Sequence, residues 1–318
     1  MEDHMSRKLL SYTAIGLILG STAIADVPKV AVDIAPVHSL VARVMDGVGS
    51  PKLVIPAGAS PHEYSLRPSE AKSLQDADMV IWIGEDLAPW MENSIETLSK
   101  NAEVITLLKE SETKLLEFRE GALFEEHDHG DHDDHDDHDD HEEHDDHGHA
   151  HGEFDAHIWL DPMNAKEMVH EIAHELGHLD PANKEKYEAN AEATMKALDK
   201  LISDVGKDIN SDAKFVVFHD AYQYFEERFG VRAAGALTLN TDVLPGAKQI
   251  ADIQDVIKDK GIKCIFSEPQ FNPKIISTIA EDTNIKTGVF DPLGANIDSG
   301  KSLYFELISN LGNELKGC

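Results

Sequence analysis

Short apolar runs alternate with amphipathic stretches along the chain that follows Val27. Apolar runs bounded by turn residues are typical of buried strands, whereas apolar residues that recur every three or four positions are typical of helices. The first half is therefore predicted to alternate between the two. The predicted strands are Lys29–Ile34, Lys52–Ile55, Met79–Ile83 and Ala102–Leu107, and the predicted helices are Val37–Met45, Ser69–Gln75 and Leu87–Ser99.

The second half repeats this alternation. Its predicted strands are Phe215–Phe218, Val231–Leu237, Cys264–Ser267 and Thr287–Phe290, and its predicted helices are Ala221–Phe229, Ala247–Lys258, Pro273–Thr283 and Ser302–Leu315. Strands that alternate with helices in this way predict an α/β protein whose sheets are mainly parallel.

Two longer helical patterns separate the halves. Asn164–His178 is predicted to end around Gly177, ahead of an Asp-Pro pair, because glycine and proline are helix stop signals. Asn183–Ile209 is a polar amphipathic pattern without internal proline, and at about 1.5 Å per residue it is long enough to cross between domains. The predicted organisation is a first lobe at 26–181, a linking helix at 182–211 and a second lobe at 212–318.

An acidic, histidine-rich tract interrupts the first lobe at 125–151. It holds ten histidines and fourteen acids without Lys or Arg, largely as Asp-Asp-His repeats. A period of three fits neither a helix nor a strand, and a charged segment without apolar residues cannot offset the entropy of ordering, so we predict a disordered loop. Imidazole and carboxylate groups bind divalent metals, and an acidic spacer would not need so many histidines. The tract is predicted to be an auxiliary metal trap formed by His127, His129, His132, His135, His138, His141, His144, His147, His149 and His151.

The N-terminus indicates export. Arg7 and Lys8 precede an apolar segment that ends in Ala23-Ile24-Ala25, the layout of a cleaved secretory signal peptide at 1–25. The predicted location is the periplasm. Cys264 and Cys318 would then meet an oxidising environment, in which they form a disulfide or remain two thiols.

The formal charge of the 318-residue chain is −32. Nucleic acid is not an expected partner, because the chain has no basic patch to bind phosphates. A negative charge of this size favours the capture of cations.

Four candidate metal ligands lie in loops or directly after predicted strands. His62 lies in the loop after Lys52–Ile55, and His157 follows the acidic tract. His219 and Asp291 come directly after strands of the second half. Ligands of parallel α/β sheets lie beyond the carboxyl ends of the strands, so a cleft between the lobes would collect all four. Three imidazoles with one carboxylate or water suit tetrahedral Zn²⁺.

Five blocks of sequence resemble the high-affinity zinc-uptake binding proteins, the ZnuA-type periplasmic components of ABC transporters. The blocks are Gly58-Ala-Ser-Pro-His62-Glu-Tyr-Ser-Leu-Arg-Pro68-Ser, Asp155-Ala-His157-Ile-Trp-Leu-Asp-Pro162, Val217-Phe-His219-Asp-Ala-Tyr-Gln-Tyr-Phe225, Phe266-Ser-Glu-Pro-Gln-Phe271 and Phe290-Asp291-Pro-Leu-Gly294. The resemblance runs from Val27 to Cys318 and includes the histidine-rich insertion and the paired cysteines. It implies two α/β lobes joined by one long helix, with zinc held between them by His62, His157 and His219.

The resemblance leaves the fourth ligand open. Asp291 matches the carboxylate of related manganese binders, whereas zinc-type members often have water there. The other candidates are His38, Glu63 and Glu268. A third imidazole at position 219, where manganese binders tend to have Glu, favours zinc.

The predicted function is zinc capture and delivery to an ABC membrane permease by a monomeric, non-enzymatic binding protein. Two alternatives remain. His174-Glu175-Leu-Gly-His178 matches the H-E-x-x-H motif of zinc metallopeptidases, although His170, His174 and His178 also fit an ordinary solvated helix face. The other alternative is a periplasmic metal buffer or chaperone that serves no transporter.

Overall fold

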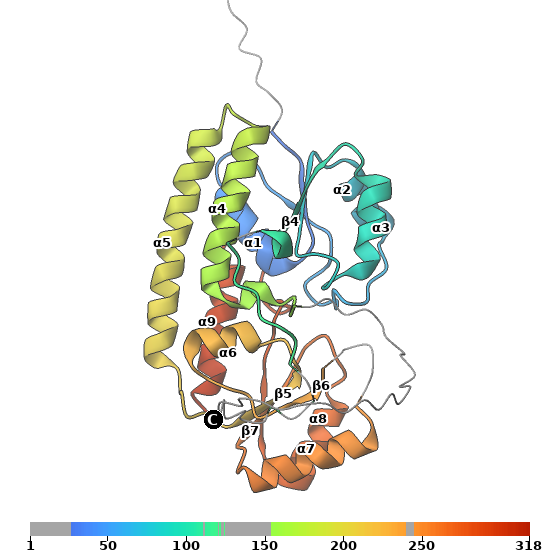
Figure 1. Ribbon diagram of the computed structural model, residues 1–318, viewed down its shortest axis with the longest axis vertical. Helices are drawn as coiled ribbons and strands as arrows, with labels where there is room; N and C mark the ends of the chain where they lie inside the picture. The colour runs from blue at the N-terminus through green and yellow to red at the C-terminus, as the bar shows by residue number, and fades with distance from the viewer. Residues whose placement is uncertain (1–26, 111, 120, 122–123, 125–153, 240–244) are drawn as a thin grey trace, which may run out of the picture.

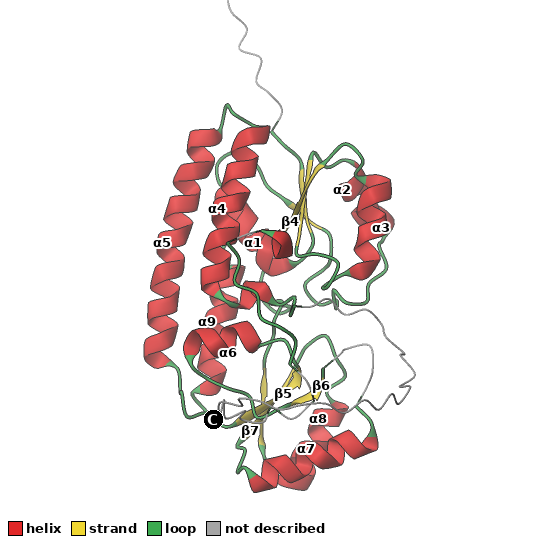
Figure 2. Ribbon diagram, viewed as in Figure 1, coloured by secondary structure: helices red, strands yellow, loops and turns green. Residues whose placement is uncertain are grey.

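A computed structural model of the chain describes residues 27–110, 112–119, 121, 124, 154–239 and 245–318 (Figure 1). The predicted signal peptide at 1–25 and the histidine-rich tract at 125–151 lie outside the described residues. The described chain forms two four-stranded parallel sheets with helices packed around them (Figure 2), which confirms the predicted α/β class.

The first sheet has the strand order β2-β1-β3-β4. Its strands are β1 (Val30–Val32), β2 (Lys52–Leu53), β3 (Met79–Trp82) and β4 (Glu103–Thr106), and its helices are α1 (Ala35–Val44), α2 (Pro68–Gln75) and α3 (Pro89–Leu98), with a 3-10 turn η1 at Leu107–Lys109. The central strand β3 is buried along its whole length. Helix α1 covers one face of the sheet, whereas α2 and α3 cover the other (Figure 1), so both faces of β3 are apolar.

The second sheet has the order β6-β5-β7-β8. Its strands are β5 (Phe215–His219), β6 (Ala236–Thr238), β7 (Cys264–Ser267) and β8 (Lys286–Val289), and its helices are α6 (Gln223–Phe229), α7 (Ala247–Asp259), α8 (Lys274–Thr283) and α9 (Leu303–Leu315). The prediction that β6 would begin at Val231 was wrong. Gly230 ends α6 in the left-handed conformation, and the amide of Val231 donates to the Glu226 carbonyl, so these residues cap the helix instead.

Helices α4 (Pro162–Leu179) and α5 (Lys184–Asp208) pack side by side along one edge of the molecule (Figure 1). Helix α5 agrees with the predicted helix Asn183–Ile209 to within one residue at each end. It contacts α1 from the first half of the chain and α9 from the second half. The exact lobe boundaries stay a prediction.

Helix α4 agrees with the predicted helix Asn164–His178 to within two residues at its start and one at its end, and it continues past Gly177 to Leu179. A β-carbon on Gly177 would approach Cγ of Lys184, the first residue of α5, to 3.0 Å. Gly177 therefore allows the two helices to approach closely at their junction, rather than ending the first of them.

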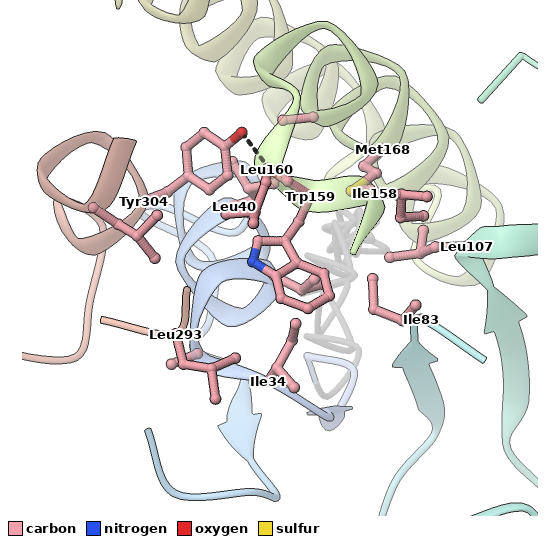
Figure 3. Packing of buried hydrophobic residues seen from close by; sticks show 14 of the residues in the cluster. Ile34, Leu40, Ile83, Leu107, Ile158, Trp159, Leu160, Met168, Leu293 and Tyr304 are labelled. Carbon is pink, nitrogen blue, oxygen red and sulfur yellow. Dashed lines mark hydrogen bonds between the residues drawn. The ribbon is translucent and has the colours of Figure 1, made fainter. Parts of the chain in front are cut away.

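A buried Trp joins the two halves of the structure. Trp159 lies in a 3-10 turn, η2 (Ile158–Leu160), among apolar side chains that come from α1 and the residue before it, from α4 and from the segment before α9 (Figure 3). Its Nε1–H donates to the Pro292 carbonyl at 2.8 Å, and the Tyr304 hydroxyl donates to the Trp159 carbonyl at 2.7 Å. The segment that carries His157 is thereby fixed to both halves of the chain.

Cys264 and Cys318 form a disulfide across a sequence separation of 54 residues. It ties the end of the chain, just beyond α9, to the first residue of β7. Replacing both cysteines by alanine is expected to lower the free energy of unfolding by about 2–4 kcal/mol, because the bond restricts the unfolded chain. Urea unfolding of the oxidised wild type and the double variant measures this difference. Equal unfolding midpoints would contradict it.

Asp33 is fully buried at the end of β1 and accepts hydrogen bonds from the amides of Ile34 and Ile83, both at 2.7 Å. Burial raises the pKa of this carboxyl to about 7, although the two backbone amides act to lower it. The folded state therefore retains a proton that the unfolded state releases above about pH 4. Stability is expected to fall by up to about 1.4 kcal/mol per pH unit as pH rises toward 7, and then to level off.

Asp33→Asn tests this dependence, because the amide does not titrate. The variant is expected to be less stable at neutral pH, since Asn offers one acceptor to two amides, but to lack the slope that the carboxyl causes. Urea unfolding at several pH values measures both slopes. Identical slopes in the variant and the wild type would show that Asp33 is not the titrating group.

Candidate metal centre

Three histidines from distant parts of the sequence meet between the two sheets. His62 lies in the loop after β2, His157 precedes η2, and His219 is the last residue of β5. One ring nitrogen from each lies within 4.8 Å of the other two. The Nε2 atoms of His157 and His219 are 3.3 Å apart. Two imidazoles bound to one tetrahedral zinc at 2.0–2.1 Å would hold their nitrogens about 3.4 Å apart, so the spacing fits that ion.

A carboxylate orients each of the two buried rings. Asp155 Oδ1 accepts from His157 Nδ1 at 2.7 Å and from the His157 amide at 3.0 Å. Oε1 of Glu268, the residue directly after β7, accepts from His219 Nδ1 at 2.7 Å. Because Nδ1 carries the proton in both rings, the Nε2 lone pairs face the shared space. Carboxylate partners of this kind also make an imidazole a better electron donor to a metal.

The charge of Glu268 changes the basicity of His219. Burial acts to lower the pKa of His219, but the charge and hydrogen bond of Glu268, helped by Asp220 and Asp155, outweigh burial and raise it. A metal at His219 Nε2 therefore competes with a proton.

Glu268 is expected to act on zinc through His219. Glu268→Ala should weaken zinc binding by about 10–100-fold, because the ring loses the partner that fixes its tautomer and direction. Glu268→Gln, whose carbonyl oxygen can still accept from Nδ1, should lose less. Titration against a competing chelator measures both affinities. If the Gln and Ala variants lose equal affinity, the hydrogen bond to Nδ1 is not the cause.

The pocket between the three rings is the size of an ion. Its cavity volume is about 10 Å³, and the residues that line it include Ser60, Trp159, Gln270 and Phe271. A space this small holds about one water molecule and excludes a peptide or other organic ligand. Ser60 Oγ and Gln270 Oε1 are buried there without a hydrogen-bond partner among the described residues.

The structure does not bring the predicted fourth ligands into this group of nitrogens. Asp291 Oδ1 accepts from the amides of Leu293 and Gly294 at 3.1 and 2.9 Å, and Oδ2 accepts from the amide of Ala295 at 2.6 Å. The Asp291 carboxylate therefore stabilises the turn after β8.

Two further candidates also lie outside the group, and the third is engaged at its edge. His38 Nε2 is 3.3 Å from the Pro51 carbonyl, and Glu63 is exposed. Glu268 also lines the pocket. Its Oε1 is hydrogen-bonded to Nδ1 of His219 rather than directed at the space between the three rings. The role of Glu268 and Asp155 as partners of Nδ1 was missed by sequence reasoning. Only the Asp-x-His spacing at 155–157 could have suggested it.

The H-E-x-x-H motif lies away from this pocket. His174 and His178 are exposed on α4, and neither lines the cavity of the three histidines.

In the part of the chain that is described, every helix is too short or too polar to cross a bilayer.

The model of the family "Zinc-uptake complex component A periplasmic", ZnuA, matches residues 30–318. The chain is 47% identical over 313 residues to the high-affinity zinc uptake system protein ZnuA of Brucella abortus, which covers 94% of each chain. It is 39% identical over 326 residues to that of Paracoccus denitrificans, with coverage of 97% of this chain and 98% of the relative.

The fold agrees with solved structures. A crystal structure of ZnuA superposes with a TM-score of 0.72 at 22% identity, and the match covers 91% of this chain and 99% of the other. A zinc-bound ZnuA deletion mutant gives a TM-score of 0.71 at 22% identity, over 91% and 98% of the two chains. The near-complete match to the family model and the identity to full-length relatives show that this chain belongs to the ZnuA family of periplasmic zinc-uptake components.

Proposed function

We propose that this protein captures Zn²⁺ through His62, His157 and His219 and delivers it to the membrane permease of an ABC transporter. The observation that carries the proposal is the convergence of three imidazole nitrogens within 4.8 Å of one another, two of them 3.3 Å apart. Three nitrogen ligands suit zinc, whereas oxygen-rich sites suit manganese and magnesium. The names of its relatives, high-affinity zinc uptake system proteins, support the same cargo.

Water is the fourth ligand that the site favours. The Asp291 carboxylate is already used by three backbone amides, so binding a metal would break the turn after β8. Ser60 Oγ and Gln270 Oε1 offer unpaired buried oxygens beside the three histidines, and a zinc-bound water could donate to them. A site with one exchangeable ligand also allows the ion to leave when the permease offers ligands of its own.

The remaining features of the proposal concern the whole chain. A cleaved signal peptide at 1–25 would place the protein in the periplasm. The tract at 125–151 would raise the local concentration of zinc near the three histidines, and the monomer would be the working form. Binding and release need no covalent chemistry.

Growth under zinc limitation tests the proposal. A strain that lacks its own copy of the gene should grow poorly in the presence of a zinc chelator, and wild-type protein should restore growth. A variant with His62, His157 and His219 replaced by alanine should not restore it, although it is exported and folded. If the triple variant restores growth as well as the wild type, the triad is not the uptake site. If the strain that lacks the gene grows normally in the presence of the chelator, the protein acts as a metal buffer rather than in uptake.

A further inference from the structure

We propose that the exposed face of α4 carries a second divalent-metal site, in which His174 Nε2 and His178 Nε2 chelate one ion and Glu175 supplies a nearby carboxylate. The site would take a transition ion that prefers nitrogen ligands, such as Zn²⁺ or Cu²⁺. It is separate from the centre formed by His62, His157 and His219.

The geometry of the two rings is that of a chelating pair. His174 and His178 are one helical turn apart, so their side chains lie above one another on the same face of α4. Their Nε2 atoms are 3.0 Å apart, close to the spacing of about 3.4 Å expected for two nitrogens on one tetrahedral zinc. At this distance one ring donates its Nε2–H to the Nε2 lone pair of the other. A metal ion would bind both Nε2 atoms once the donor ring has exchanged that proton through solvent and carries it on Nδ1 instead.

Carboxylates lie beside His174. Glu175 Oε1 lies 3.7 Å from His174 Nε2, and the carboxyl groups of Glu175 and Glu103 share a hydrogen bond. Glu103 belongs to β4, so the acidic groups come from two different elements. The contact with Glu175 raises the pKa of Glu103, and burial together with Glu171 and Glu175 raises that of Glu110. A divalent cation beside His174 would relieve this repulsion.

The exposure of the site sets its expected strength. His174 and His178 are exposed, so an ion reaches them directly from solvent. Two imidazoles on a solvent-exposed helix provide fewer and less rigid ligands than the three histidines of the buried centre. The second site is therefore expected to fill at higher zinc concentrations, and to bind Cu²⁺ more tightly than Zn²⁺.

Carbethoxylation of the full-length protein, with each modified histidine located by peptide mass spectrometry, tests this site without interference from other histidines. A metal-bound nitrogen does not react, so Zn²⁺ added alone should first protect the buried centre and then His174 and His178. His170 is the matched internal control, because it is exposed on the same helix one turn earlier. It should keep its reactivity.

His178→Ala tests whether zinc is bound by both rings together or is only attracted by the nearby carboxylates. Alanine favours the helix and the position is exposed, so the variant should fold and retain the tight zinc centre. Protection of His174 by Zn²⁺ should then disappear. Glu175→Gln should shift protection to higher zinc concentrations. The proposal is overturned if His174 is protected equally in the His178→Ala protein, if His170 is protected together with the pair, or if saturating Zn²⁺ leaves both histidines reactive.

Discussion

Replacing His219 by alanine is expected to weaken the tight zinc site by more than about 100-fold, because the loss of an outer-shell partner alone costs about 10–100-fold. His219 contributes one of the three converging nitrogens, and it is 4% exposed, so solvent does not reach the position easily. The ring also carries the link from Glu268 to the metal. Its removal leaves two imidazoles and breaks the tetrahedral set that zinc prefers.

A competition titration of full-length protein against a zinc chelator measures this loss as the disappearance of the tightest binding equivalent. The weaker equivalents that we assign to the histidine-rich tract should remain. His38→Ala is the matched control, because His38 is a partly buried histidine of α1 that contacts Pro51 rather than the other histidines. It should keep the tight equivalent. The assignment fails if the His219 variant retains that equivalent at wild-type affinity.

The strands and the meeting of the histidines were within reach of sequence reasoning. The apolar run at 264–267 is bounded on both sides by polar residues, and the strand β7 has the predicted limits. Ligands at the carboxyl ends of parallel strands lie at one edge of a sheet, which is the reason to expect His219 near the other candidate ligands. Its Nε2 lies 3.3 Å from that of His157. His157 could be placed because it stands beside an apolar segment that had to be buried.

The sequence does not show which hydrogen-bond partners individual polar side chains have in the folded protein. Glu268 and His219 are 49 positions apart, and no local pattern pairs them. Asp291 has the residue type of a metal ligand, yet a run of free amides in the following turn takes up its oxygens. A glycine near the end of a helix can either mark that end or allow another segment to pack closely against the helix. For Gly177, only the position of Lys184 in the folded structure shows that close packing is its role.

A buried ion network next to the metal centre leads to the second large prediction. Arg119 donates from Nε to Asp220 Oδ2 at 3.0 Å and from Nη1 to Glu226 Oε2 at 2.7 Å. Its guanidinium carbon also lies 3.8 Å from the centre of the Phe124 ring. The Asp220 and Glu226 side chains are 7% and 5% exposed, so water cannot replace the lost partner. The network joins the segment that follows the first sheet to β5 and α6 of the second.

Arg119→Met is expected to destabilise the protein by about 3–5 kcal/mol, because it leaves two buried carboxylates without their cation. Burial already raises the pKa of Glu226, and Arg119 is the group that opposes this rise. Urea unfolding at neutral pH measures the loss. Lys114→Met is the matched control, since Lys114 pairs with Glu227 at the same junction but both side chains are about half exposed. That variant should lose less than about 1 kcal/mol. Equal losses in the two variants would mean that the junction is held by packing rather than by the buried charge of Arg119.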